Sequence, residues 1–359
     1  MNRYVIANLR LASQQIVTTN FRSPKEIIGW MGAMQAQDFN MAKWAIGLRL
    51  NNATEKKIDM AIDSGEIIRT HLLRPTWHFV SADDIYWMLD LSSSRILSSM
   101  KGRNKQLDLT DKIFKKSFKI IEKVLRDGNH LTRKELVNEL NKANIATDNF
   151  RSSHIFFTAE LEGIICSGKM IGKQTSYALL NERIQKPGTI KKEEALAKLA
   201  EKYFESHCPA TASDFAWWSG LSVADAKRAI EIIKRNFISE KINSEEYWFR
   251  SSFSSPKKFK DAGFLLPAFD EFLISYKDRT AAIILEDHGK AFSNNGIFWP
   301  TIVINGQVKG TWKREIKKDT LIIEANFFDK KNRKSKDFLL EASGKIGYFL
   351  NLKTEINRK

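Results

Sequence analysis

Cysteine is scarce in this sequence, and its two cysteines, Cys166 and Cys208, lie far apart and form no CxxC pair. Such sparse usage fits a reducing compartment, so we expect a cytoplasmic protein, and it argues against a cysteine-based metal site. No apolar run approaches the length needed to cross a bilayer, so no membrane partner is expected. Residues 1–15 also lack the apolar core and the small-residue cleavage site of a signal peptide.

The sequence also lacks the motifs of several common enzyme classes. It contains no HExxH, no GxxxxGK[ST], no GxSxG and no GxGxxG that opens a helix. Its six histidines are scattered rather than grouped at metal-ligand spacing. These absences argue against zinc proteases, P-loop enzymes, α/β-hydrolases and dinucleotide-binding enzymes. We therefore expect neither a metal nor a cofactor.

Acidic residues are too few to balance the basic ones. Lys and Arg total 58 against 42 Asp and Glu, which gives a net charge of +16. Residues 101–134 hold eleven bases and four acids, and a second basic cluster spans 329–336. The bases of the first cluster are Lys101, Arg103, Lys105, Lys112, Lys115, Lys116, Lys119, Lys123, Arg126, Arg133 and Lys134. Such a field attracts polyanions, of which nucleic acid is the commonest, although a lysine-rich solubilising surface has the same composition.

One supersecondary pattern occurs three times in the first 252 residues. In its first copy, Ser23 and Glu26 have capping-box spacing ahead of an apolar stripe, and a second helix is expected over 54–62. Residues 67–80 are rich in branched and aromatic side chains and predict two strands, with Pro75 between them. Helix, helix and two-stranded ribbon is the order of a winged helix-turn-helix.

The pattern returns twice with new residues. Helices are expected at 111–125, 131–143 and 152–164 with a hairpin turning near Ser167-Gly168, and again at 191–207, 211–220 and 222–235 with a wing at 237–249. After a Ser/Pro/Lys-rich linker at 251–263, Asn305-Gly306 between alternating apolar residues predicts a β-hairpin, and a helix is expected around 337–351.

These patterns predict an α+β fold of three tandem winged helix-turn-helix units followed by a C-terminal β-rich, barrel-like domain. The expected boundaries are 1–100, 101–190, 191–252 and 253–359. Winged helices bind DNA with the third helix or the wing, but they also serve as protein-docking modules. The charge of the chain favours DNA.

Two glutamines, Gln35 and Gln37, flank one alanine in the segment MQAQDF. Glutamine has no useful pKa and cannot act as a general acid or base. Side chains two residues apart on a helix diverge, so both glutamines can reach one ligand only if the helix ends near Met34–Gln35 and the segment is extended or in a turn. Asp38 either orients this pair or caps the next segment. Taken alone, the segment is also compatible with a polar helix terminus.

Three segments together resemble the AlkZ-like DNA glycosylases: MGAMQAQDF, RTHLLRPTWHFVSADDIYWML and LLPAFDEFLISYKDR, in this order. The resemblance covers essentially the whole chain and implies enzymes that remove alkylated purines and unhook interstrand crosslinks. It implies that Gln35 and Gln37 are the catalytic pair of a Gln-x-Gln branch, whereas a sister branch has aspartate at the second position. It therefore implies a monofunctional DNA glycosylase whose partner is double-stranded DNA with alkylated bases.

Chemistry makes two glutamines sensible catalysts. A purine alkylated at N7 or N3 is already cationic and leaves as a neutral base, so no strong acid is needed. An amide can instead position a water and stabilise the developing sugar cation.

Further residues are expected to contact DNA. They are Arg49, Arg69, His71, Arg74, His78, Arg279 and the lysines Lys115, Lys116 and Lys119. Each is equally compatible with a packing or surface role, and Asp270 is expected either in catalysis or as a buried acid paired with Arg279.

The alternative function is a non-catalytic winged-helix DNA-binding protein, such as a transcription regulator. A sequence-specific regulator usually needs dimer symmetry, whereas a glycosylase does not, so the leading interpretation predicts a monomer.

Overall fold

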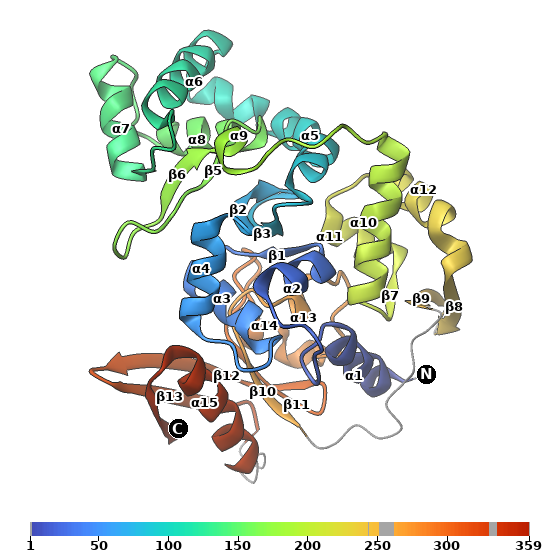
Figure 1. The fold of residues 1–359 in the computed structure, drawn as a ribbon. Coiled ribbons are helices and arrows are strands. Elements are labelled where there is room, and N and C mark those ends of the chain that lie inside the picture. Colours follow the sequence, from blue (N-terminus) through green and yellow to red (C-terminus); the bar gives the residue numbers. More distant parts are fainter. Residues whose placement is uncertain (1, 243, 251–261, 330–335, 359) are drawn as a thin grey trace. The chain divides into compact units, whose positions relative to one another are not determined.

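The computed structural model describes residues 2–242, 244–250, 262–329 and 336–358 and divides into two compact units. Unit 1 comprises Met1–Ile58 and Leu196–Lys359, and unit 2 comprises Asp59–Ala195. Both units contain helices and strands, as the α+β prediction requires (Figure 1). The basic cluster at 329–336 and the linker at 251–263 lie almost entirely outside the described residues.

The order helix, strand, helix, helix, strand, strand occurs three times along the chain. The first copy is α2 Pro24–Met31, β1 Ala33–Gln35, α3 Phe39–Leu48, α4 Glu55–Ser64, β2 Ile67–Leu72 and β3 Arg74–Ser81. The second is α6 Asp111–Leu125, β4 Leu131–Thr132, α7 Arg133–Lys142, α8 Arg151–Leu161, β5 Ile165–Ser167 and β6 Ser176–Leu179. The third is α10 Lys192–Ser206, β7 Ala210–Thr211, α11 Ala212–Ser219, α12 Val223–Ile233, β8 Phe237–Ile242 and β9 Glu245–Arg250. In the second and third copies the strands form three-stranded sheets in the orders β4-β6-β5 and β7-β9-β8.

Capping boxes start one helix in each copy. The side chains of Ser23, Thr132 and Thr211 each accept a hydrogen bond from the backbone N–H three residues later. The acidic side chain at that later position accepts a hydrogen bond from the backbone N–H of the capping residue. The local sequence therefore sets these helix starts without help from tertiary contacts. The predictions at Ser23 and Thr132 are confirmed.

Helix α6 in unit 2 separates apolar and basic residues cleanly. Phe114, Ile121 and Leu125 are buried in the core of unit 2, together with Leu136 and Phe156 from the neighbouring helices. All eleven bases of the 101–134 cluster are exposed. The helix thus contributes an apolar face to the core and a cationic face to solvent.

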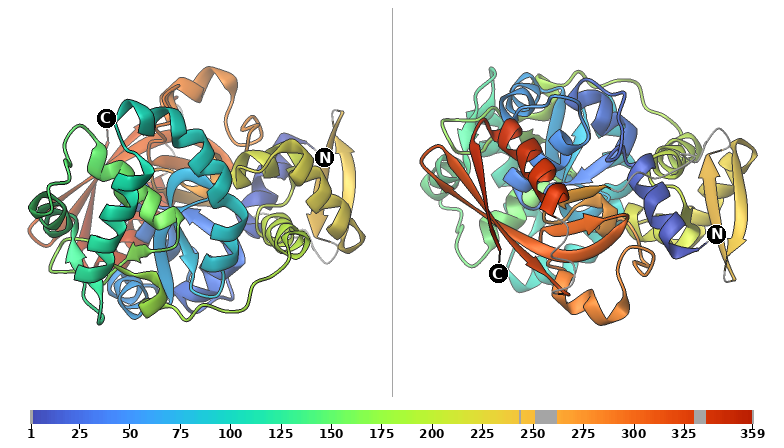
Figure 2. Two further views of the ribbon diagram at one scale, coloured as in Figure 1. Left: turned by 90° about the horizontal axis from the view of Figure 1, so that it is seen from above. Right: turned by 90° about the horizontal axis from the view of Figure 1, so that it is seen from below.

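The C-terminal part of unit 1 is a curled sheet. Its strands are β10 Gly263–Leu266, β11 Thr301–Ile304, β12 Gln307–Lys317, β13 Thr320–Phe327 and β14 Lys353–Arg358, paired in this order. Asn305 and Gly306 both have positive φ and form the predicted hairpin turn between β11 and β12. The sheet is a half-barrel rather than a closed barrel, with β10 and β14 at its edges (Figure 2).

Helix α15 Lys336–Leu350 packs on this sheet against β10 and β14. It also packs against α3, where a Cβ on Gly47 would lie 2.5 Å from the Phe349 ring. Only glycine allows this approach, so α15 ties the half-barrel to the helix that follows the glutamine segment.

Several elements differ from the sequence predictions. The chain reverses at Leu73, which has φ +60°, and Pro75 lies inside β3 rather than between the strands. The hairpin after β5 turns over residues 168–175, a longer connection than predicted. Helices α1 Arg3–Ser13 and α3 had no predicted counterpart, and α5 Ile85–Gln106 follows β3. In unit 1, the short elements α13 Glu271–Ile274 and α14 His288–Ala291 connect β10 to β11, while α9 Leu180–Arg183 follows β6 in unit 2. No helix in the described ranges is long and apolar enough to span a membrane.

Candidate active site around the glutamine segment

The two glutamines lie on an extended connection between helices. Helix α2 ends at Met31, three residues earlier than the sequence predicted, and the chain turns at Gly32 into strand β1. Gly32 has φ +77°, and a Cβ there would lie 3.3 Å from the Trp218 ring, so both conformation and space favour glycine. The predicted local conformation is confirmed: neither glutamine is helical.

Gln35 and Gln37 have different environments. Gln35 is buried, at 6% exposure, whereas Gln37 is exposed. The side chain of Asp38 accepts a hydrogen bond from Met41 N at 3.0 Å and caps helix α3. Of the two roles expected for Asp38, the structure therefore shows the helix cap.

A buried carboxylate lies directly behind the segment. Glu271 Oε1 accepts a hydrogen bond from the backbone N–H of Gln35 at 2.6 Å. Glu271 Oε2 accepts a hydrogen bond from the Ser275 hydroxyl and lies 3.8 Å from His207 Nε2. All of these groups belong to unit 1, and Glu271 and His207 are 1% and 0% exposed.

The contacts of Glu271 keep it ionised. Burial raises the pKa of this carboxyl, but the His207 ring, the Ser275 hydroxyl and the Gln35 amide outweigh burial and lower the pKa to about 2. Burial lowers the pKa of His207 despite the neighbouring carboxylate, so the imidazole is neutral at neutral pH. The site behind the glutamines is thus an anion held by neutral donors.

Arg49 and Asp270 form a second buried group in unit 1. The guanidinium contacts both Asp270 oxygens at 2.9 Å, and it also donates to Gln14 Oε1 at 2.9 Å. Arg49 is completely buried, so the expectation that it contacts DNA is wrong. The expected pairing of Asp270 with Arg279 is also wrong, because Arg49 occupies both carboxylate oxygens.

Arg279 lies apart from that pair. Its Nε donates to Leu273 O at 3.0 Å, and its guanidinium lies over the rings of Trp217, Phe292 and Phe298 at 5.2 to 5.4 Å. The side chain is half-buried. Its cationic end therefore remains a candidate for phosphate contact.

In unit 2, the first ribbon contains four of the residues expected to bind DNA. Arg69 is half-buried and lies over the Trp77 ring at 4.0 Å, and Arg74 is half-buried. The ring of His71 contacts the buried Glu160 carboxylate through Nδ1. His78 is 1% exposed, and its Nδ1 lies 2.9 Å from Thr76 O. The two histidines are buried, which does not fit the DNA contact expected of them. The two arginines are only half-buried and remain candidates for DNA contact.

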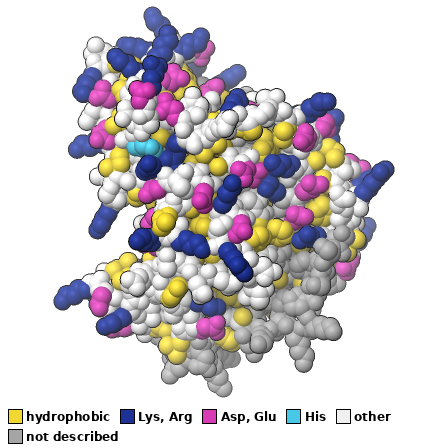
Figure 3. Space-filling model, viewed as in Figure 1, with side chains coloured by type: hydrophobic (Ala, Val, Ile, Leu, Met, Phe, Trp, Pro, Cys, Tyr) yellow, Lys and Arg dark blue, Asp and Glu magenta, His cyan; other side chains and the backbone are white. Residues whose placement is uncertain are grey.

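The predicted lysines lie together on α6. Lys115, Lys116 and Lys119 are exposed, and Lys116 Nζ donates to Ala143 O at 2.6 Å. Basic side chains gather at the top of Figure 3, over α6. This cationic face is the strongest candidate surface for polyanions within unit 2.

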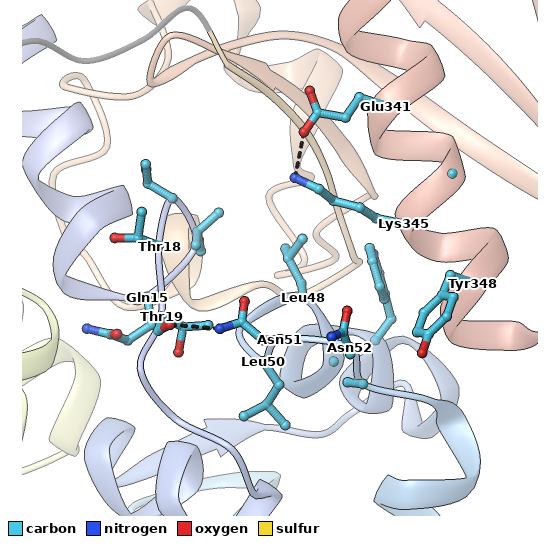
Figure 4. A pocket seen from close by; sticks show the side chains of 16 residues that line it. Gln15, Thr18, Thr19, Leu48, Leu50, Asn51, Asn52, Glu341, Lys345 and Tyr348 are labelled. Atoms are coloured by element: carbon cyan, nitrogen blue, oxygen red, sulfur yellow. Dashed lines mark hydrogen bonds and ion pairs between the residues drawn. The ribbon is translucent and has the colours of Figure 1, made fainter.

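A separate pocket of about 410 Å³ lies within unit 1, between the chain after α1, the end of α3 and α15 (Figure 4). Two of its polar contacts are internal to the lining: Asn51 donates to Thr19 O at 3.0 Å, and Lys345 pairs with Glu341 at 2.9 Å. Neither glutamine lines it. We assign it no part in the chemistry, because the candidate catalytic groups lie elsewhere.

The sequence analysis missed the role of Glu271, His207 and Ser275. The adjacent acids Asp270 and Glu271 were visible in the FDEF segment, but nothing in the local sequence indicates which partner each acid contacts. Asp270 pairs with Arg49, 221 residues away, and Glu271 contacts Gln35, 236 residues away. Only the fold assigns one acid to each partner.

The repeated modules, the half-barrel and the cationic helix define a modular α+β protein suited to nucleic acid. The family model described as "DNA glycosylase AlkZ-like" matches residues 28–342, and the chain belongs to this family of DNA repair hydrolases. Among solved structures it is similar to the Streptomyces sahachiroi DNA glycosylase AlkZ, with a TM-score of 0.81, 18% identity and 99% of each chain covered. At that identity the likeness shows the shared fold. A comparison with curated proteins found no match.

Proposed function

We propose that this protein is a monofunctional DNA glycosylase that hydrolyses the N-glycosidic bond of cationic alkylated purines. The substrates would be N7 and N3 adducts in double-stranded DNA, including interstrand crosslinks formed at these positions. Family membership supports a DNA glycosylase. The observation that carries the narrower proposal is the neutral, non-helical Gln-x-Gln segment, in which Gln35 ends strand β1 and Gln37 is exposed in the bend that follows.

The chemistry fits a neutral pair of side chains. A purine alkylated at N7 or N3 carries positive charge and leaves as a neutral base, so the enzyme needs no strong acid. Gln35 and Gln37 would position the attacking water and stabilise the oxocarbenium-like sugar through their amide dipoles. Glutamine adds no negative charge that DNA phosphates would repel. Of the two anions near the segment, Glu271 is buried, and the exposed Asp38 caps helix α3.

We infer that the three repeated modules are winged helices and that the cationic groups bind the DNA backbone. The proposed contacts are Lys115, Lys116, Lys119, Arg69, Arg74 and Arg279, which are exposed or half-buried. Backbone contacts of this kind give affinity without sequence preference, as a repair enzyme requires. We propose that the protein acts as a monomer.

The test is base release from a defined lesion. The protein is incubated with duplex DNA containing one N7-methylguanine, and abasic sites are then cleaved with alkali. Strand cleavage at the lesion is expected, and the same duplex without the methyl group is the control. Binding without base release would favour the alternative, a non-catalytic winged-helix DNA-binding protein.

A second measurement tests the monofunctional mechanism. Neither glutamine can form a Schiff base, so borohydride should trap no covalent protein–DNA complex during the reaction. A bifunctional glycosylase with a lysine nucleophile run in parallel confirms that the trap works. A trapped complex would contradict hydrolysis by a positioned water.

A further inference from the structure

Within the described residues, one hydrogen bond joins the buried carboxylate of Glu271 to the glutamine segment. Its Oε1 accepts the backbone N–H of Gln35 at 2.6 Å, the short distance typical of a charge-assisted bond. Strand β1 is only three residues long and lies between the turn at Gly32 and the cap at Asp38. This bond therefore fixes the middle of a short connection.

The carboxylate is itself held from several sides. Ser275, one turn later, donates its hydroxyl to Oε2, and the His207 ring lies against the same oxygen. Tyr203 donates its hydroxyl to Ser275 O at 3.0 Å, and Asp270 caps the helix α13 on which Glu271 lies. Glu271 cannot shift without breaking bonds that would leave buried polar groups unsatisfied.

We propose that Glu271 is a positioning residue, which fixes the backbone at Gln35 and thereby aims Gln35 and Gln37 at the substrate. The inference rests on the proposed function of the glutamines. Gln37 follows β1 by only two residues and lies in a bend, so a displacement of the backbone at Gln35 changes the direction of both side chains. Glu271 touches no reacting atom in this scheme and acts only through the segment.

The competing interpretation is that Glu271 only stabilises the fold. Asp214 provides a matched control, because it is an equally buried carboxylate in unit 1 that also accepts hydrogen bonds from backbone N–H groups. It accepts the backbone N–H of Lys277 at 2.8 Å and that of Thr211 at 3.1 Å, and it pairs with Arg10 at 3.4 Å. None of these partners belongs to the glutamine segment.

The experiment compares Glu271→Ala, Glu271→Gln and Asp214→Asn in single-turnover excision of N7-methylguanine at saturating enzyme. Misplaced catalytic groups typically cost on the order of a hundredfold, so we expect about that loss for Glu271→Ala and a smaller one for Glu271→Gln, which keeps an acceptor oxygen. DNA affinity should not change in either variant. Asp214→Asn should lower the melting temperature but excise at the wild-type rate. If Glu271→Ala does not fold, Glu271→Gln decides the question.

A second readout does not depend on activity. Amide hydrogen exchange of a peptide covering residues 33–38 should accelerate in Glu271→Gln and stay unchanged in Asp214→Asn. Wild-type exchange and wild-type excision in Glu271→Gln would overturn the inference, as would an equal loss of excision in Asp214→Asn. If the wild-type protein releases no base, the proposed function fails, and the exchange measurement alone then decides whether Glu271 positions the segment.

Discussion

Helix α6 and the region behind the glutamines both concentrate ionised groups, but these groups are exposed on α6 and buried behind the glutamines. On α6 the lysines are exposed, so water solvates them and salt screens them. Behind the glutamines, Glu271, Asp270 and Arg49 are almost fully buried and held by specific donors and acceptors. Exposed charge suits binding a polyanion anywhere along its length, whereas buried charge suits holding one segment in one position.

The largest effect is expected where a buried ion pair loses one partner. Arg49→Met leaves Asp270 unpaired in the interior, which should lower the free energy of unfolding by about 3–5 kcal/mol. Urea denaturation measures this loss. The control is the double variant Arg49→Met/Asp270→Leu, which removes both charges and should recover much of the stability. A single variant as stable as wild type would contradict a buried pair.

Lowering the pH should also destabilise the buried groups around Glu271 more than it destabilises helix α6. The folded pKa of Glu271 is about 2, below its ordinary value of 4.5, so its contribution is complete above pH 4.5 and is lost as pH falls toward 2. That contribution is roughly 3 kcal/mol. Neutral His207, whose pKa burial lowers, begins to oppose folding below about pH 6.5.

Denaturant unfolding at several pH values measures this dependence. Glu271→Gln should flatten the stability curve between pH 4.5 and 2, because the variant has no carboxyl to protonate at this position. An equally steep curve in the variant would assign the acid sensitivity to other groups.

Substitutions of the glutamines should impair catalysis without impairing DNA binding. Gln35→Ala and Gln37→Ala should each slow single-turnover excision by about a hundredfold, the usual cost of losing one positioned polar contact. Gln37→Leu should be nearly inactive, and Gln37→Asp should retain activity with altered preference among cationic lesions. DNA affinity, measured by anisotropy, should stay close to wild type in the two alanine variants and in Gln37→Leu, because these substitutions change no charge. Wild-type excision by both alanine variants would show that the glutamines are only polar side chains on the connection between α2 and α3.

Substitutions of the α6 lysines should have the opposite effect, on DNA binding rather than on catalysis. Reversing the charge of Lys115, Lys116 and Lys119 should weaken DNA binding and reduce the slope of affinity against salt, by about 0.9 for each lost phosphate contact. Excision at saturating enzyme should be unaffected. Reversal of Lys290, Lys345 and Lys353, which pair with acids in unit 1, is the matched control. An unchanged salt slope in the α6 variant would place the DNA contact elsewhere.

The sequence by itself determined the features that short-range chemistry controls. The capping boxes at Ser23 and Thr132 set helix starts through contacts within three residues. The turn at Asn305-Gly306 follows from the ease with which these residues adopt positive φ. The basic face of α6 follows from helical periodicity. The extended glutamine segment was inferred correctly from the divergence of helical side chains, and the family resemblance was confirmed by the match over residues 28–342.

Only the tertiary structure decided which side chains are buried and which partners they take. Arg49 and His78 had the composition of DNA contacts, yet both are buried, because burial depends on elements distant in sequence. The adjacent acids Asp270 and Glu271 diverge to Arg49 and to the Gln35 backbone across more than two hundred residues of chain. Periodicity and local motifs contain no information about such distances. The sequence therefore located the glutamines, and the folded chain supplied the buried carboxylate that holds them.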